Sequence, residues 1–306
     1  MSAMRMVVMD PELEAFVPLL VKADLTDPVT DRKNYAERAA AAPAPDTSRM
    51  EIEDRTVPAD PDVPVRIYRP NGARGTIIWL HGGAWVMGDL DTDRHFSARL
   101  AAGAGTVVIS VDYRRSPEHR FPAALDDTYA VLTWTAEHAA ELDIDPNRIA
   151  VGGHSAGAGL AAAVALRARD QQGPAIRFQL LNQPLLDDRQ DTWSQRNFTD
   201  TPLHDRDTLT AAWRHYLGSE PATPCAAPAR ADDLSGLPPA YVATAEFDPL
   251  RDEGITYALR LLQAGVPVEL HQWPGTFHGS LAVLSADVSQ RQFAELGVAL
   301  RRAVAE

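Results

Sequence analysis

The spacing of hydrophobic and polar positions changes several times along the 306-residue chain, and each change predicts a new element. Near the N-terminus, residues 11–24 carry apolar positions at helical spacing and predict an amphipathic helix, and residues 31–42 predict a second helix. From residue 50 the pattern changes to that of strands. Residues 51–57 and 63–68 predict two strands that a turn-rich connection joins, so we expect them to pair antiparallel.

After residue 76, short apolar runs alternate with helical patterns. The run at 76–80 is apolar without interruption, as in a strand that is covered on both faces. The pattern predicts strands at 76–80, 106–111, 148–151, 176–181, 240–245 and 267–273, and helices at 93–102, 122–141, 155–169, 250–264 and 287–304. Strands that alternate with helices form a mostly parallel sheet with helices on both faces, so the predicted fold class is α/β.

Residues 184–235 interrupt this alternation. The segment is polar and rich in Asp, Thr and Pro, and it predicts one helix, at 207–217, which carries Trp213 and Tyr216. An insertion of this size between two core strands is where a cap over the sheet would sit, packed with the N-terminal helices. The predicted division is N-terminal cap helices at 1–48, a core at 49–183 and 236–306, and a cap insertion at 184–235.

Composition and charge exclude several classes of partner. The chain is 45% hydrophobic and 23% charged, as in ordinary globular proteins, and its net charge of −13 disfavours nucleic acid or an anionic membrane as a partner. Cys225 is the only cysteine, so no intrachain disulfide can form. The first 16 residues lack the apolar core of a signal peptide, and no stretch is long and apolar enough to span a membrane. We therefore expect a cytoplasmic protein.

Residues 153–157, Gly-His-Ser-Ala-Gly, have the spacing of a nucleophile elbow. Such an elbow is a tight strand-to-helix turn that exposes one serine hydroxyl, here that of Ser155. The strained turn brings neighbouring backbone close, so only very small residues fit at Gly153 and Gly157. Glycine-rich turns before helices are common, so the pattern predicts a nucleophile only if the chain also supplies its partners.

An oxyanion-binding loop is the first such partner. The strand predicted at 76–80 ends in His-Gly-Gly-Ala-Trp at 81–85. Acyl transfer needs backbone N–H donors aimed at the developing oxyanion, and glycines let the backbone approach it. A loop at this position and the residue after the nucleophile supply the donors in α/β-hydrolases, which assigns Gly82, Gly83 and Ala156.

A carboxylate just past the end of a core strand can orient a catalytic imidazole. Asp248 is placed in this way after the strand at 240–245, and the Pro249 that follows suits the first position of a helix. Asp252 and Glu253 fall in the first turn of that helix, where acidic residues favour the helix dipole. We therefore predict that Asp248 is the acid and that the other two are structural.

The base must reach the serine from a loop at the same edge of the sheet. His278 meets this requirement, because it follows the last predicted strand in the stretch Pro-Gly-Thr-Phe-His-Gly. His271 lies within that strand and is expected to be structural, and His81 is expected to fix the oxyanion loop by hydrogen bonding. No comparable context surrounds the other histidines, His95, His119, His138, His204 and His215.

The order Ser155, Asp248, His278 along the chain is that of α/β-hydrolases. The chain resembles the hormone-sensitive-lipase-like branch of this superfamily, the bacterial family IV carboxylesterases, from about residue 50 to residue 303. The motifs that carry the resemblance are HGGAW (81–85), DYRRSPEHRFPAALDD (112–127), GHSAG (153–157), DPLRDEG (248–254) and FHG (277–279).

This resemblance implies an α/β-hydrolase fold whose cap, made by the N-terminal helices and the insertion, lies over pockets for the acyl and alcohol groups. It implies a triad of Ser155, Asp248 and His278 and an oxyanion hole formed by Gly82, Gly83 and Ala156. It also allows a homodimer that forms through an edge strand. The acids of the 112–127 stretch and His119 are expected to be structural.

Three positions depart from the family pattern. Ala84 replaces the third glycine of the oxyanion loop, where its methyl group would narrow the pocket and leave the donors intact. His154 stands where the family commonly has an acid; strand geometry points it away from the serine, so we expect a structural or tuning role. Arg115 and Ser116 replace the usual Leu-Ala, a change expected to affect packing only.

The predicted function is metal- and cofactor-independent hydrolysis of small or short-chain carboxylic esters by a serine esterase. One alternative is a specialised deacetylase, amide hydrolase or lactone hydrolase that acts on a particular metabolite through the same triad. Another is a non-hydrolytic ligand-binding protein on the same scaffold. Trp85, Trp213 and Tyr216 are candidates for lining the substrate pocket, and the alternative for each is ordinary packing.

Overall fold

The computed structural model describes residues 8–23 and 25–305. The prediction about a signal peptide therefore falls partly on residues 1–7, which lie outside the described residues. Within the described residues one sheet has eight strands in the order β1-β2-β4-β3-β5-β6-β7-β8. These strands are β1 Met50–Val57, β2 Val63–Pro70, β3 Thr76–Leu80, β4 Val107–Val111, β5 Ile149–His154, β6 Phe178–Asn182, β7 Ala240–Phe247 and β8 Val268–Phe277.

Strand direction follows the predicted scheme. β2 pairs antiparallel with both β1 and β4, and every pair from β4 to β8 is parallel. The central strands β3 and β4 are buried along their whole length, as their uninterrupted apolar sequences require. The predicted α/β class with a mostly parallel sheet is confirmed.

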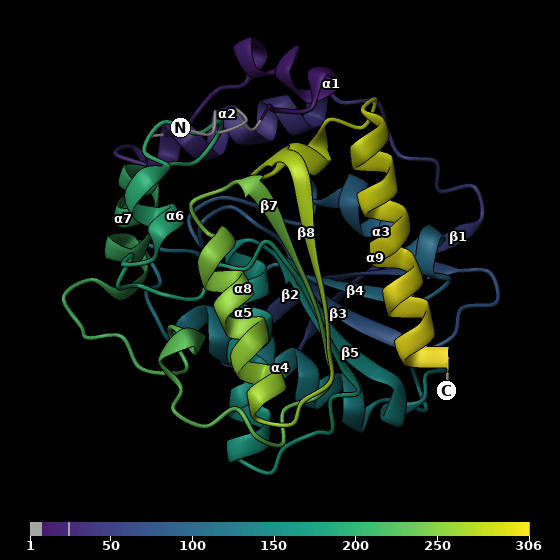
Figure 1. Ribbon diagram of the computed structural model, residues 1–306. Coiled ribbons are helices and arrows are strands. Elements are labelled where there is room, and N and C mark those ends of the chain that lie inside the picture. The colour runs from purple at the N-terminus through teal and green to yellow at the C-terminus, as the bar shows by residue number, and fades with distance from the viewer. Residues whose placement is uncertain (1–7, 24, 306) are drawn as a thin grey trace.

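Helices cover both faces of this sheet (Figure 1). They are α1 Pro11–Glu14, α2 Pro28–Ala41, α3 Arg94–Ala104, α4 Ala123–Glu137, α5 Ala156–Asp170, α6 Trp193–Asn197, α7 Arg206–Leu217, α8 Arg251–Gln263 and α9 Asp287–Ala305. One apolar cluster holds α4, α5 and α8 against the sheet, and a second holds α3 and α9 against the opposite face. The alanine- and glycine-rich sequence of α5 lets this helix be buried on nearly all sides.

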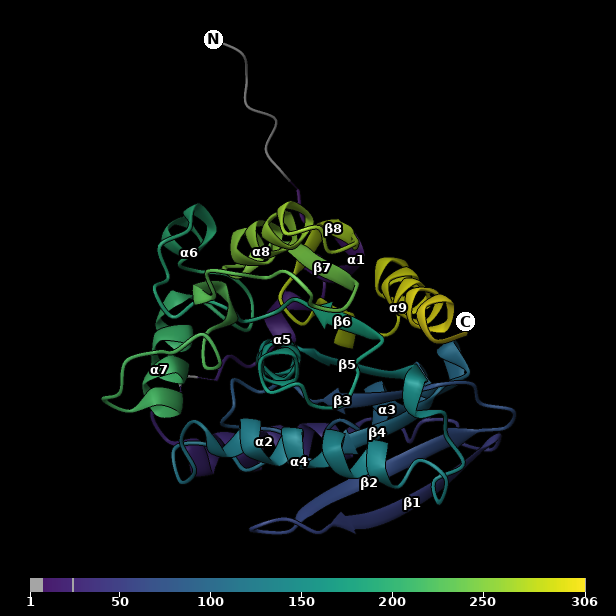
Figure 2. The same ribbon diagram turned by 90° about the horizontal axis from the view of Figure 1, so that it is seen from below.

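The N-terminal segment and the insertion lie together where the carboxyl ends of the parallel strands point (Figures 1 and 2). Lys22 forms an ion pair with Asp205, which caps α7. His215 of α7 bonds through Nε2 to the carbonyl oxygen of Leu25 at 2.7 Å. Arg32 of α2 donates from Nε to the Val86 carbonyl in the loop after β3, at 2.6 Å. The contacts of Lys22 and Leu25 show that the N-terminal segment packs against the insertion, as the sequence predicted.

Two local predictions about these segments are wrong. The helix expected at 11–24 is replaced by α1 and a 3₁₀ turn at Val17–Leu19, because Pro18 lacks an N–H and breaks the helical pattern; residue 24 lies outside the described residues. The insertion contains α6 in addition to the predicted helix. Thr192 caps α6 by accepting a hydrogen bond from the Gln195 N–H, a local device that apolar spacing did not reveal.

Candidate active site

Ser155, His278 and Asp248 form one chain of hydrogen bonds. Ser155 Oγ lies 2.9 Å from His278 Nε2, and His278 Nδ1 lies 2.8 Å from Asp248 Oδ2. The serine stands between β5 and α5, the aspartate directly follows β7, and the histidine directly follows β8. All three are buried, with exposures of 4%, 1% and 0% for Ser155, His278 and Asp248. The structure thus brings together the three residues predicted from the sequence.

Backbone crowding at the elbow explains its glycines. Ser155 adopts φ 57° and ψ −120°, a conformation that few non-glycine residues take. A Cβ atom added at Gly157 would come well under 3.0 Å from the carbonyl oxygens of Leu80 and His81, and one at Gly153 would come equally close to the backbone of Gly157. The helix that carries the serine can therefore approach the end of β3 only because these side chains are missing.

The three acids that follow β7 have separate partners. Asp248 Oδ1 accepts a hydrogen bond from the Leu250 N–H at 2.8 Å, so both of its oxygens are engaged. Asp252 accepts from the Ser194 N–H at 2.8 Å. Glu253 accepts from the Leu186 N–H at 2.7 Å, and its burial raises the pKa of its carboxyl well above the usual value. Asp252 and Glu253 hold the insertion, and only Asp248 contacts the imidazole.

The glycine loop after β3 lies against the nucleophile. A Cβ atom added at Gly82 would be 3.6 Å from the Ser155 Cβ atom. Gly83, at φ 117°, closes a tight turn in which its carbonyl accepts from the N–H groups of Val86 and Met87. Ala156 is the first residue of α5, where backbone N–H groups have no partner within the helix. This arrangement can present backbone donors to an oxyanion beside Ser155.

His81 fixes this loop. Its Nδ1 bonds to the Gly82 carbonyl at 2.8 Å, and its ring stacks on Tyr113 at a centroid distance of 4.2 Å. The Tyr113 hydroxyl donates to the His81 carbonyl at 2.8 Å. Burial lowers the pKa of His81 to about 4, so its ring is neutral near pH 7. These contacts agree with the structural role expected from the sequence.

The three aromatic candidates for the substrate pocket form one stack. The rings of Trp85 and Tyr216 are nearly parallel, with centroids 4.0 Å apart, and Trp213 packs on Trp85 at 4.6 Å. Their exposures are 1% for Trp85, 5% for Trp213 and 1% for Tyr216. The stack joins the oxyanion loop to α7 of the insertion. Its packing role is visible, and a contact with substrate stays a prediction.

Two histidines flank the imidazole of His278. The ring of His154 lies 5.4 Å from it, and Asn182 Nδ2 bonds to His154 Nδ1 at 3.0 Å. His204, from the insertion, meets His278 edge-on at 4.9 Å. Burial, followed by the charge of His278, lowers the pKa of His204 to about 3 and that of His154 well below its usual range. His154 was expected to point away from Ser155 and to have a structural or tuning role, and its place beside the ring of His278 is compatible with tuning. No pattern in the sequence pointed to His204.

Other sequence-predicted groups lie outside this cluster. Asp127, in the 112–127 stretch, accepts from the backbone N–H and the guanidinium of Arg114, as a structural acid does. His271 stacks on Trp273 at 3.9 Å within β8. Among the described residues, no group of three or more His, Cys, Asp and Glu side chains could hold a metal ion. In the same part of the chain, no helix is long and apolar enough to cross a membrane.

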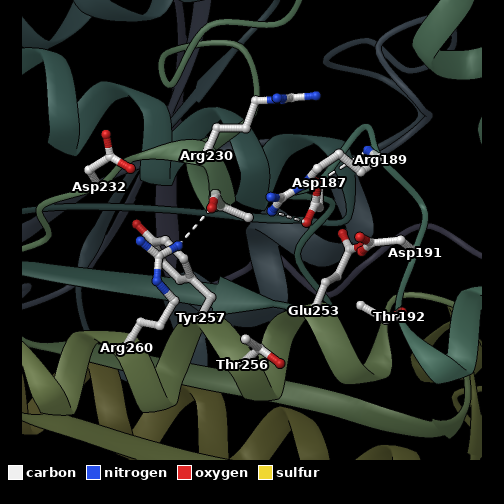
Figure 3. A pocket seen from close by; sticks show the side chains of 11 residues that line it. Asp187, Arg189, Asp191, Thr192, Arg230, Asp232, Glu253, Thr256, Tyr257 and Arg260 are labelled. Atoms are coloured by element: carbon white, nitrogen blue, oxygen red, sulfur yellow. Dashed lines mark hydrogen bonds and ion pairs between the residues drawn. The ribbon is translucent and has the colours of Figure 1, made fainter.

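A pocket of about 350 Å³, lined mainly by charged residues, lies between the insertion and α8 (Figure 3). Arg189 pairs there with Asp187 at 2.7 Å, and Arg260 donates to the Ala229 carbonyl at 2.6 Å. Arg230 pairs with the neighbouring Asp188. The cationic groups of this pocket are therefore already engaged, and no triad residue lines it.

A buried serine–histidine–aspartate chain beside a glycine loop, at the carboxyl ends of parallel strands, defines an α/β-hydrolase. Residues 77–282 match the family model described as alpha/beta hydrolase fold. The chain belongs to this family. The resemblance to its hormone-sensitive-lipase-like branch is also confirmed by relatives and solved structures with esterase names.

The curated relatives include carboxylesterase NlhH of Mycobacterium tuberculosis, which is 45% identical over 75% of this chain and 75% of that protein. The arylesterase of Saccharolobus solfataricus is 34% identical over 89% of this chain and 92% of its own length. Among solved structures, a bacterial heroin esterase is 44% identical, with a TM-score of 0.92 over 97% of this chain and 98% of that one.

Proposed function

We propose that this protein is a serine carboxylesterase that hydrolyses small or short-chain carboxylic esters through an acyl-enzyme intermediate. The observation that carries the proposal is the buried chain of hydrogen bonds from Ser155 through His278 to Asp248, next to the glycine loop. Relatives with esterase names support the same reaction class, among them an ethyl acetate hydrolase of Pseudomonas putida that is 36% identical over 71% of this chain and 70% of its own length.

The acylation step begins when Ser155 Oγ attacks the ester carbonyl carbon and His278 Nε2 takes the hydroxyl proton. Asp248 accepts the hydrogen bond of His278 Nδ1, which keeps Nε2 free to act as the base and stabilises the imidazolium. The negative carbonyl oxygen of the tetrahedral intermediate is bound by the backbone N–H groups of Gly82, Gly83 and Ala156.

The intermediate collapses when the alcohol leaves with the proton from His278, and the acyl group remains on Ser155. A water molecule then loses a proton to His278 and attacks the acyl carbon. The carboxylic acid is released and Ser155 regains its proton. One ester and one water give one acid and one alcohol, and the groups of the chain return to their initial state.

The cap, location and assembly belong to the same proposal. Residues 1–48 and 184–235 form a cap over the acyl and alcohol sites, a division supported by the contacts of Lys22 and Leu25 with α7. The protein acts in the cytoplasm, a location that is compatible with its single cysteine. It pairs as a homodimer through the edge of the sheet, and size-exclusion chromatography with light scattering tests this assembly.

Substitution of the nucleophile tests the reaction. Ser155→Ala should abolish hydrolysis of p-nitrophenyl acetate and butyrate, and it should also abolish labelling by a fluorophosphonate probe. Circular dichroism should show an unchanged fold. If purified Ser155→Ala still turns over either ester at the wild-type rate, the assignment of Ser155 is wrong.

A substrate series tests the class of bond. Acyl chains of increasing length, matched acetyl amides and lactones should be compared by kcat/KM. The proposal expects the highest values for short-chain esters. A preference for an amide or a lactone by more than about tenfold would instead favour a specialised deacetylase or lactone hydrolase that uses the same triad. If the wild-type protein neither hydrolyses any of these compounds nor reacts with the probe, the result favours the non-hydrolytic ligand-binding alternative.

A further inference from the structure

Gln183 is a buried residue next to the triad that the mechanism above does not use. It directly follows β6 and is 1% exposed. Its φ of 50° lies in the left-handed region, which non-glycine residues seldom adopt and which is enriched at functional sites. The preceding residue, Asn182, accepts a hydrogen bond from the Ser155 N–H at 2.9 Å. Gln183 therefore directly follows the residue whose carbonyl binds the backbone N–H of the nucleophile.

The side chain of Gln183 reaches the other end of the triad. Its Oε1 accepts a hydrogen bond from the Gly279 N–H at 2.8 Å. A backbone N–H can only donate, so the amide oxygen of Gln183 must face Gly279 and the orientation of the amide is fixed. Gly279 directly follows His278, and a peptide unit is planar. By holding this N–H, Gln183 fixes the plane of the peptide that leaves the His278 Cα atom.

Gly279 is also held by its own turn and by a contact with the insertion. Gly279 has φ 75° and begins a short 3₁₀ turn, Ser280–Ala282. The insertion packs near it, because a Cβ atom added at Gly279 would be 3.2 Å from Leu203 Cδ1. The residue after the base therefore contacts both the Gln183 side chain, at the end of β6, and a loop of the insertion.

We propose that Gln183 is a positioning residue for the general base, which holds His278 at hydrogen-bonding distance from Ser155 through the Gly279 N–H. This inference rests on the proposed function. The imidazole must take a proton from Ser155 and then deliver it to the leaving alcohol, so its Nε2 must stay within reach of both. A displacement of about 1 Å can cost about 100-fold in rate.

Substitution of Gln183 by a residue of similar size without the amide oxygen tests the role. Gln183→Met keeps the length of the side chain and removes the oxygen that holds Gly279. We expect kcat for p-nitrophenyl acetate to fall about 10- to 100-fold, with KM changed by less than about threefold, because the ester-binding groups are untouched. Gln183→Leu should give the same result and serves if the methionine variant does not fold.

A conservative variant and a matched control separate positioning from packing. Gln183→Glu keeps an oxygen for the Gly279 N–H, so it should recover kcat to within about threefold of wild type. Gln179 is an equally buried glutamine within β6, the strand that Gln183 follows, and its Nε2 donates to the Pro238 carbonyl at 2.9 Å rather than to a group next to the triad. Gln179→Leu should lower stability as much as Gln183→Met, with kcat unchanged.

The labelling rate of the fluorophosphonate probe gives an independent reading, because this reaction also needs His278 to accept the proton of Ser155. It should fall in parallel with kcat in Gln183→Met. The inference is overturned if Gln183→Met and Gln183→Leu keep the wild-type kcat, if Gln179→Leu loses as much, or if Gln183→Glu recovers nothing. These outcomes presuppose an active wild type. A wild-type protein without activity or labelling refutes the proposed function instead.

Discussion

Asp248→Asn should disable His278 as the base by moving the proton of its ring from Nδ1 to Nε2, while the ring keeps its position. Asp248 Oδ1 accepts from the Leu250 N–H, and Oδ2 accepts from His278 Nδ1. An asparagine here must turn its oxygen toward the Leu250 N–H, so its NH₂ group faces His278 Nδ1. The ring nitrogen can then only accept, and the ring proton moves to Nε2. In this tautomer Nε2 has no lone pair for the hydroxyl proton of Ser155.

The expected loss of kcat is large because, among the described residues, His278 Nδ1 has no partner other than residue 248. Asp248 and His278 are 0% and 1% exposed, so water cannot enter to offer Nδ1 another partner. When the aspartate of a serine-protease triad is replaced by asparagine, the wrong tautomer lowers kcat about 10⁴-fold, which corresponds to about 5.4 kcal/mol in the activation free energy. We expect a similar loss here.

The assay is kcat for p-nitrophenyl acetate at about pH 7.5, with thermal unfolding by circular dichroism to show that the variant folds. Asp252→Asn is the matched control, because this acid lies in the following helix α8 and bonds to the Ser194 N–H without touching the triad. It should keep kcat within about threefold of wild type. A folded Asp248→Asn enzyme that loses less than about tenfold would refute the tautomer argument.

Two further substitutions test the backbone crowding at Gly157 and the effect of the Asp93 pKa on stability. Gly157→Ala should lower kcat/KM by more than about 100-fold or prevent folding, because its Cβ atom would overlap backbone oxygens; Gly103→Ala, where nothing lies within 4 Å, should raise thermal stability slightly. Burial raises the pKa of Asp93 to about 7, so its contribution to stability is present at low pH and is lost as the pH rises toward 7. The full shift corresponds to about 4 kcal/mol, and the partial exposure of Asp93 reduces the expected effect to about half of this value. Asp93→Asn should therefore gain about 2 kcal/mol in unfolding free energy relative to wild type between about pH 4 and about pH 8, measured by urea denaturation, and an unchanged difference would contradict this assignment.

Much of the core could be predicted because its determinants are local. Uninterrupted apolar runs identify buried strands, and the carboxyl ends of parallel strands meet at one edge of the sheet. Residues that follow such strands, namely Gly82, Ser155, Asp248 and His278, must therefore lie near one another. The alternation of strands and helices, together with the glycine spacing around Ser155, was enough to predict this part of the site.

The boundaries and the flanking groups could not be predicted in the same way. β8 continues to Phe277 through Pro274 and Gly275, residues that usually end a strand. The pairing with β7 runs from Ala245–Trp273 directly to Phe247–Phe277, so Pro274 and Gly275 lie in a bulge where a proline costs no ladder hydrogen bond. His204 reaches His278 from a loop of the insertion whose path depends on packing between distant segments. No spacing rule within the chain encodes such a contact.

The stack of Trp85, Tyr216 and Trp213 also gives the molecule an optical signal. The centroids of the two indoles are 4.6 Å apart, one in the glycine loop after β3 and the other in the insertion. Indole emission is sensitive to a neighbouring ring and to water, so any separation of α7 from the loop would alter the fluorescence of this pair. The chain has six tryptophans, so the part of a stopped-flow fluorescence signal that comes from this pair is the part that Trp213→Phe removes.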